Sequence, residues 1–184
     1  GLAAGTSFRI LNKTSAGAIS GTFAGKPEGS VFSDDGYPWI ISYLGGDGND
    51  VVLTLATPVQ AWRFQYFGTI ANSGTAADTF DKDKDSLINL LEYALATNPN
   101  THNPSPHSVT RNGSTLDFIY PKNKSATDIT YSVEWSETLG NDWSNAGVGA
   151  PMILSDTGIT QQITVTLPAG VNGSRFVRLR VARP

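Results

Sequence analysis

The residue types best suited to chemistry are concentrated between residues 81 and 92, where aspartates alternate with lysines before an apolar run begins. Alternating side chains of a tight loop point inward, and residues three apart lie on one helix face, so their oxygens can converge on one point. Oxygen ligands in a flexible arrangement favour Ca²⁺ over Zn²⁺ or Cu²⁺. The predicted ligands are the side chains of Asp81, Asp83, Asp85, Asn89 and Glu92 and the backbone carbonyl of Leu87.

The spacing of this stretch matches a calcium loop nearly position for position, with one departure. Ser86 stands where such loops carry glycine to make a sharp turn. A serine there is expected to need a positive φ, at a cost on the order of 1 kcal/mol. The alternative interpretation is a solvated acidic turn that caps a helix, but four carboxylates converging without a cation would repel one another. The calcium site is the preferred hypothesis.

Two short helices are predicted around this loop, within a connector that spans residues 58–104. The first begins at Pro58 and ends before Gly68, a proline start and glycine stop. The second covers residues 87–96, with leucines at helical spacing, and it stops at Asn98-Pro99. The Pro-rich residues 102–106 that follow are interpreted as a linker.

The connector separates two zones with β-strand patterns. Residues 1–57 hold short runs rich in β-branched and aromatic residues, and residues 105–184 are predicted to form an antiparallel β-sandwich. Asn112-Gly113 is the strongest hairpin signal. The strands are expected at 6–11, 18–23, 39–43, 51–55, 108–111, 114–120, 129–135, 159–167 and 175–181. The predicted fold class is therefore mainly β, with a short helical, EF-hand-like connector.

Composition excludes several classes of function. The formal net charge of −3 provides no basic field for nucleic acid, and the absence of cysteine excludes disulfides and thiol catalysis. No apolar run approaches the ~20 residues that a membrane helix needs. A surface of hydroxyls, amides and glycines is typical of extracellular β-rich proteins, and Gly1 begins in mid-pattern, so we expect a fragment of a longer secreted protein.

The acidic loop and its flanks also resemble a known kind of segment. Residues 77–81 and 81–99 are similar to the dockerin-like or thrombospondin-type-3-like calcium segment near the C-terminus of many large bacterial surface proteins. That segment has the pattern D-x-D-x-D-G-L-x-N-x-x-E-Y-A-L-G-T-x-P and follows a short helix with a tryptophan, here Trp62. Ser86 and Ala96 stand where the family prefers glycine. The resemblance implies calcium binding and a location outside the cell or on its surface.

The two β zones carry resemblances of their own. Residues 21–25, 27–29 and 41–53 resemble the C-terminal end of autotransporter-associated β-strand repeats, which implies a β-helix end or hairpins. The motifs 131–134 and 175–179, with Leu139 and Trp143, resemble the β-sandwich that usually follows the calcium segment. The implied partner is the rest of the parent polypeptide.

A second glycine-rich motif, Gly45 to Leu53, matches one repeat of a calcium β-roll. A β-roll binds each ion between successive turns, so a single copy cannot complete a site. We therefore expect a hairpin that joins 39–43 to 51–55.

Aromatic and basic side chains suggest a polysaccharide as a further partner. Tyr37 and Trp39 form the aromatic pair expected to be most exposed, and aromatic faces can pack on sugar rings. Arg178 and Arg180 share one strand face opposite Val177 and its alternating apolar neighbours. That arginine face is expected to be solvated. The alternative is that it binds an anionic polysaccharide.

Catalysis is the least supported class. The two histidines flank a Pro-rich segment without a nearby nucleophile, and no Gly-x-Ser-x-Gly motif is present. Glu134 and Glu137 could form an acid–base pair, but the alternation of their strand places Glu134 toward water. The preferred hypothesis is a non-catalytic, calcium-binding structural or adhesion module, and the alternative is a carbohydrate-binding module of a polysaccharide-degrading enzyme.

Overall fold

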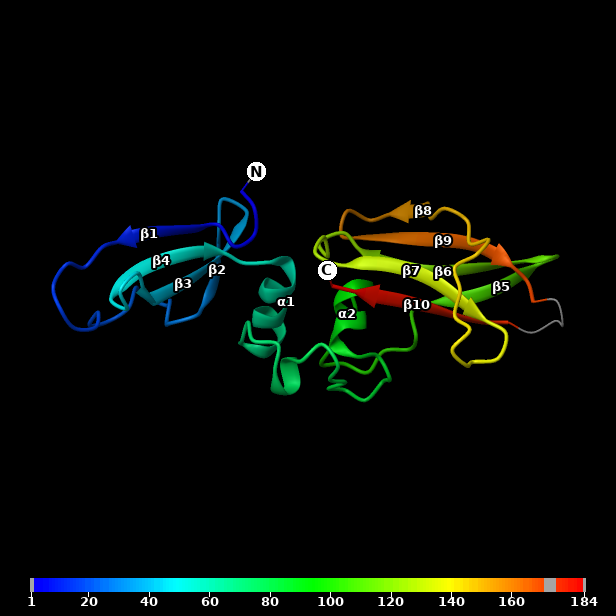
Figure 1. Ribbon diagram of the computed structural model, residues 1–184, viewed down its shortest axis with the longest axis horizontal. Helices are drawn as coiled ribbons and strands as arrows, with labels where there is room; N and C mark the ends of the chain where they lie inside the picture. Colours follow the sequence, from blue (N-terminus) through cyan, green and yellow to red (C-terminus); the bar gives the residue numbers. More distant parts are fainter. Residues whose placement is uncertain (1, 171–174, 184) are drawn as a thin grey trace. The chain divides into compact units, whose positions relative to one another are not determined.

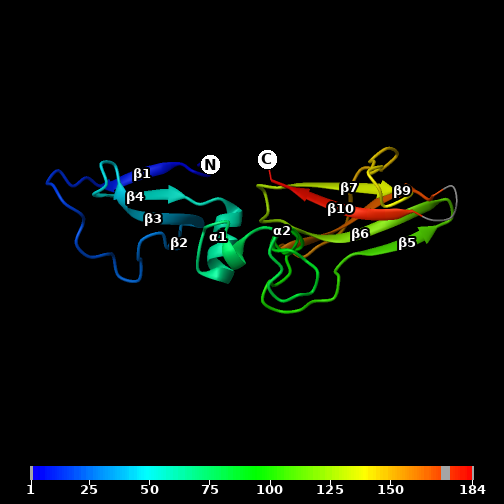
Figure 2. The same cartoon turned by 60° about the horizontal axis from the view of Figure 1, so that its bottom comes forward.

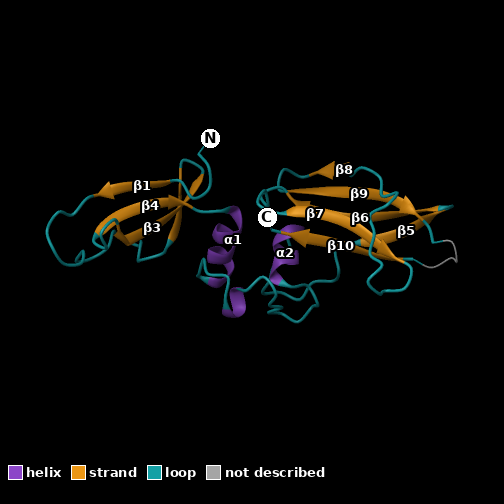
Figure 3. Cartoon of the chain, in the orientation of Figure 1, coloured by secondary structure: helices purple, strands orange, loops and turns teal. Residues whose placement is uncertain are grey.

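The computed structural model describes residues 2–170 and 175–183. The chain is mainly β with antiparallel sheets, as the sequence predicts (Figures 1 and 3). It divides into two compact units, Gly1–Ala77 and Asp78–Pro184. This boundary falls inside the stretch 58–104 that the sequence predicts as one connector, so each unit contains one of the two α-helices. No helix among the described residues is long and apolar enough to cross a membrane.

The first unit contains one four-stranded antiparallel sheet. Its strands are β1 (Ser7–Leu11), β2 (Val31–Asp34), β3 (Tyr37–Gly45) and β4 (Asp50–Leu55), in the order β1-β4-β3-β2. The glycine-rich motif forms the hairpin between β3 and β4, as predicted. Ile41, Tyr43 and Val51 form the buried core of the sheet.

Helix α1 (Pro58–Phe67) follows this sheet and ends the way the sequence predicts. Thr57 and Gln60 form a reciprocal capping box at its start, and Gly68 closes it in the left-handed conformation with φ of 69°. The helix buries Arg63, whose Nε donates to the carbonyl of Ala76 at 3.2 Å. That contact fastens α1 to the 3-10 turn η1 (Gly74–Ala76) of the same unit.

The second unit contains two sheets and helix α2 (Asn89–Leu95) (Figure 2). One sheet has the order β5-β6-β9-β8 and the other pairs β10 with β7. Asn112 and Gly113 join β5 to β6 as predicted, with Gly113 at φ of 61°. The strands are β5 (Ser108–Asn112), β6 (Thr115–Asn123), β7 (Thr130–Ser136), β8 (Met152–Asp156), β9 (Thr160–Pro168) and β10 (Phe176–Ala182).

One apolar core joins both sheets of the second unit with the segment around α2. Phe118 and Val165 enter it from the four-stranded sheet, and Val133 enters from β7. Leu87 and Leu95, which flank or end α2, are buried in the same core. The predicted leucine stripe therefore packs against the C-terminal strands, and the acidic loop is part of the C-terminal unit.

Strand β10 shows the predicted alternation. Arg178 and Arg180 are exposed, whereas Val177, Leu179 and Val181 are partly buried. Val177 and Leu179 pack against the core of the unit. The register expected from the sequence is therefore confirmed, since a slip of one residue would exchange the two faces.

Two strands were not expected, and one expected strand does not form. The predicted run 18–23 does not form a strand; Gly17, just before it, and Gly21, within it, have φ of 88° and 83°. These left-handed residues interrupt an extended backbone. Strands β2 and β8 are short edge strands, and all five residues of β8 are exposed, so neither carries a clear alternation of apolar and polar residues.

Candidate metal centre

The acidic loop is shaped by hydrogen bonds from its own backbone to its carboxylates. Asp81 accepts from the N–H of Lys84 at 2.7 Å and from the N–H of Ser86 at 2.9 Å. Asp83 accepts from the N–H of Asp85 at 3.2 Å, and Asp85 accepts from the N–H of Leu87 at 2.8 Å. Short acidic side chains form such local turns readily, so the alternating sequence itself folds this loop.

Ser86, which replaces the glycine of typical calcium loops, has the positive φ that the sequence predicts. Ser86 has φ of 77° and Lys84 has φ of 64°, both in the left-handed region. Ala96, the second position at which the resembled segment prefers glycine, ends α2 with φ of 57°. Both departures therefore place a side chain where the backbone favours glycine.

Helix α2 carries the last two predicted ligands and is firmly held. The N–H of Asn89 donates to the carbonyl of Phe80 at 2.8 Å, which closes the loop at the start of the helix. At the other end, the hydroxyl of Tyr131 donates to the carbonyl of Ala94 at 2.8 Å. Asn123 Nδ2 donates to the carbonyl of Tyr93 at 2.8 Å. Strands β6 and β7 thereby fix the helix that presents Asn89 and Glu92.

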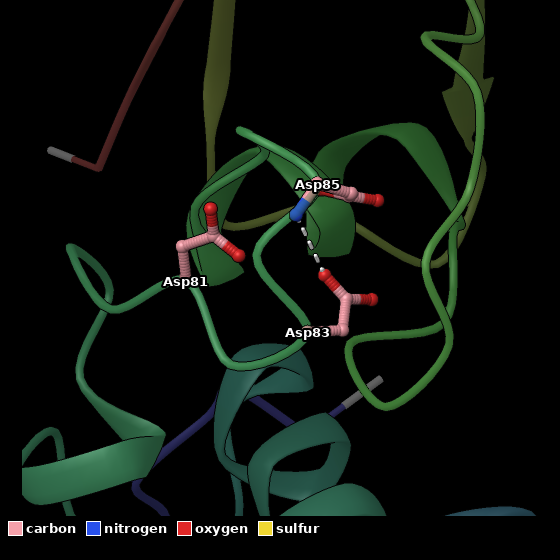
Figure 4. Close-up of side chains that lie close together, drawn as sticks. All are labelled: Asp81, Asp83 and Asp85. Atoms are coloured by element: carbon pink, nitrogen blue, oxygen red, sulfur yellow. Dashed lines mark hydrogen bonds between the residues drawn. The ribbon is translucent and has the colours of Figure 1, made fainter.

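The three aspartates project from one short loop, and the N–H of Asp85 donates to the Asp83 carboxylate (Figure 4). Asp81, Asp83 and Asp85 each offer one carboxylate oxygen, and these oxygens all lie within 4.8 Å of one another. Exposed acidic groups often gather without a cation, so the triad alone is not evidence for a metal. The state of the fourth carboxylate, Glu92, provides an independent test of fit.

Glu92 is a buried carboxylate without a hydrogen-bonding partner. Its relative exposure is 0%, and neither side-chain oxygen has a partner among the described residues. Burial, together with the charges of Asp83, Asp85 and Asp81, raises the pKa of Glu92 to about 8. Asp83 Oδ2 is likewise buried without a partner in the described chain. A buried carboxylate costs several kcal/mol unless a cation or donors compensate it.

These carboxylates fit a hard cation with oxygen ligands. Asp81, Asp83, Asp85 and Glu92 supply anionic oxygens, Asn89 supplies a buried amide on the same helix, and Leu87 lies between the loop and the helix. Glu92 is not among the carboxylates whose oxygens all lie within 4.8 Å of one another, but the charges of the three aspartates act on it. The aspartate triad could therefore hold a metal ion.

The segment after α2 also belongs to this site, which the sequence did not indicate. The N–H of Asn103 donates to Asp85 Oδ2 at 3.0 Å, and Lys82 donates to Asn100 Oδ1. The sequence predicts residues 102–106 to be a linker, yet Asn103 supports a predicted ligand. The asparagines around Pro99 were the signal in the sequence that could have indicated this turn. The side chain of Pro99 is buried.

The aromatic candidates lie in the first unit, on β3. Tyr37 and Trp39 have ring centroids 6.4 Å apart, with the ring planes tilted by 47°. Phe8 of β1 adds a third ring, 5.8 Å from Trp39 and inclined by 70°. Tyr37 and Phe8 are exposed, but the three planes do not form a flat platform for a sugar.

The arginine candidates lie in the second unit, on β10. Arg178 donates to Glu134 Oε2 through Nε at 2.9 Å and Nη2 at 2.7 Å, and its guanidinium stacks on Trp143 at 3.9 Å. Arg180 is exposed and has no ion-pair partner in the described part of the chain. Glu137, the other carboxylate considered for catalysis, accepts from Arg175. Both glutamates are therefore engaged by arginines on the neighbouring strand or just before it.

Comparisons with protein-family models, with curated proteins and with solved structures found no match.

Proposed function

We propose that the chain is a non-catalytic, calcium-binding structural module of a secreted bacterial surface protein, in which an EF-hand-like connector precedes a β-sandwich. The observation that carries the proposal is Glu92, a fully buried carboxylate whose two oxygens lack partners among the described residues. The three aspartates whose charges act on Glu92 belong to one short loop. A divalent cation is the simplest group that compensates all four carboxylates.

Calcium suits this site better than other metals. The candidate ligands are all oxygens, which disfavours the softer transition metals. They come from a loop and a helix in an irregular arrangement, and Ca²⁺ accepts six to eight oxygens in irregular geometry, whereas Mg²⁺ demands a near-ideal octahedron. In the proposed role, the ion fixes the start of α2 and thereby the packing of Leu87 and Leu95 in the core of the second unit.

Isothermal titration with calcium tests the proposal directly. The wild-type chain is expected to bind one Ca²⁺, and Asp83→Asn is expected to weaken binding by at least about tenfold because it removes one anionic ligand. Asp47→Asn is the matched control, since Asp47 is an exposed aspartate of the first unit. Absence of calcium binding by the wild type, or equal weakening by both variants, would overturn the proposal.

A carbohydrate-binding module is the alternative from a different class. Such a module needs a flat aromatic surface on which a sugar ring can stack. Phe8, Tyr37 and Trp39 do not form one, because their ring planes are inclined to one another. Its anionic form would use Arg178 and Arg180, but Arg178 is already engaged by Glu134, so of this pair Arg180 alone offers an unpaired guanidinium within the described residues. These two observations favour the structural role over recognition of a glycan.

A further inference from the structure

A groove lies between α2 and the last strand of the second unit. It has a volume of about 280 Å³, and its lining is apolar on the helix side and mixed on the strand side. Ile88, Leu90 and Leu91 form one wall. Residues 178–181 of β10 form the other wall. Figures 1 and 2 show β10 finishing beside α2, and contacts join these two elements.

The strand wall presents an open sheet edge. Of the described strands, only β7 pairs with β10, so one edge of β10 keeps its backbone groups available. An open edge is a template for an added strand, which contributes main-chain hydrogen bonds, while pockets for alternate side chains provide specificity. Arg178, Leu179, Arg180 and Val181 all line the groove, so basic and apolar residues alternate along this wall.

The charged residues that line the groove indicate which side chains a bound peptide would carry. Its lining contains two arginines and no acidic residue among those described. Arg178 is neutralised by Glu134, but the Arg180 guanidinium is exposed without an ion-pair partner in the described chain. A complementary occupant therefore carries acidic side chains on the arginine face and apolar side chains toward Leu90 and Leu91.

We infer that this groove docks an extended peptide segment of alternating apolar and acidic residues, which adds as a strand to the open edge of β10. The inference rests on the proposed function in one respect. The apolar wall is built from residues that lie in sequence between the proposed ligands Leu87, Asn89 and Glu92, so a bound calcium ion would hold that wall in place. Docking is accordingly strongest in the calcium-loaded chain.

The test uses the full chain in calcium and a short fluorescent peptide of alternating valine and glutamate as the probe. Fluorescence anisotropy is expected to show binding, and Arg180→Glu is expected to weaken it by at least about tenfold through charge repulsion. Arg111→Glu is the matched control, because Arg111 is exposed on β5, outside the groove. A probe that is N-methylated on alternate residues is expected to lose binding, since it cannot complete a strand ladder.

The outcomes separate this inference from the calcium proposal. Three results would refute peptide docking in the groove. These are no binding by the calcium-loaded chain, equal binding of a valine–lysine probe, and equal weakening by Arg180→Glu and Arg111→Glu. Retention of binding by the N-methylated probe would overturn strand addition. If titration shows no calcium binding while the probe still binds through Arg180, the groove stands and the calcium proposal fails.

Discussion

At the scale of single residues, buried and exposed carboxylates differ in the groups that compensate their charge. Glu92 is buried without donors, whereas Asp142 receives hydrogen bonds from Ser136, Thr138 and the N–H of Glu137. The pKa values respond in opposite directions: that of Glu92 is raised to about 8, and that of Asp142 is lowered to about 2. Burial without a donor thus raises one pKa, whereas hydrogen bonds from its own loop lower the other.

Asp142 predicts an acid-sensitive contribution to stability. Its pKa is lowered mainly by the hydrogen bond from Ser136, so its contribution is present above the ordinary pKa of an aspartate and is lost as the pH falls from about 4 to 2. Asp142→Asn is expected to flatten this part of the profile of unfolding free energy against pH. Chemical denaturation across that range measures it, and an unchanged acid slope in the variant would contradict the assignment.

Ser86 predicts a gain in stability on substitution by glycine. Because Ser86 has φ of 77°, Ser86→Gly is expected to stabilise the calcium-loaded chain by about 1 kcal/mol and to retain or strengthen calcium binding. Ser155→Gly, in the extended strand β8, is the control and is expected to destabilise by about 0.5–1 kcal/mol. Equal effects of the two substitutions in denaturant titrations would rule out relief of backbone strain at Ser86.

At the scale of elements, α2 owes its position to distant hydrogen bonds. Tyr131→Phe removes the hydroxyl that donates to the carbonyl of Ala94, and it is expected to cost about 1 kcal/mol of unfolding free energy. Tyr37→Phe, on an exposed ring of the first unit, is expected to change stability little. Thermal or chemical unfolding measures both. A Tyr131→Phe variant as stable as the wild type would show that this bond does not anchor the helix.

The same contrast between local and distant causes decides what the sequence could predict. The Pro58–Gly68 helix, the Asn112-Gly113 hairpin, the positive φ at Ser86 and the alternation in β10 follow from neighbouring residues, and all four are observed. The sequence did not predict strands β2 and β8 or the contact of Asn103 with Asp85. The contact of Asn103 with Asp85 joins residues 18 apart, which no local pattern identifies. Strands β2 and β8 instead pair with the next strand along the chain, and β2 is joined to β3 by Asp35-Gly36, a local hairpin signal that could have identified it.

At the scale of the whole molecule, the proposed ion links a surface loop to the core of the second unit. Leu87 follows the acidic loop and Leu95 ends α2, and both are buried with Phe118 and Val165. Loop order and core packing are therefore expected to be coupled. Without the cation, the repulsion of the carboxylates favours opening of the loop, since few apolar contacts hold such loops closed.

Hydrogen exchange should reveal this coupling. Removal of calcium with EDTA is expected to increase deuterium uptake in residues 81–103 by mass spectrometry, because the loop and α2 open more often. The β3–β4 hairpin of the first unit serves as the internal control and is expected to exchange equally with and without calcium. Uniform changes in both regions would indicate an effect of calcium that does not arise at the acidic loop.

The most direct test of the central claim is the melting temperature of the full chain in millimolar calcium and in EDTA. Free calcium at about 100 times the dissociation constant adds roughly 2.7 kcal/mol by mass action, which corresponds to a rise on the order of 5–10 °C. The account predicts this rise for the wild type and for Asp47→Asn, and its loss in Glu92→Gln. A wild-type melting temperature that is the same in calcium and in EDTA would contradict the account and identify residues 81–92 as a plain acidic turn.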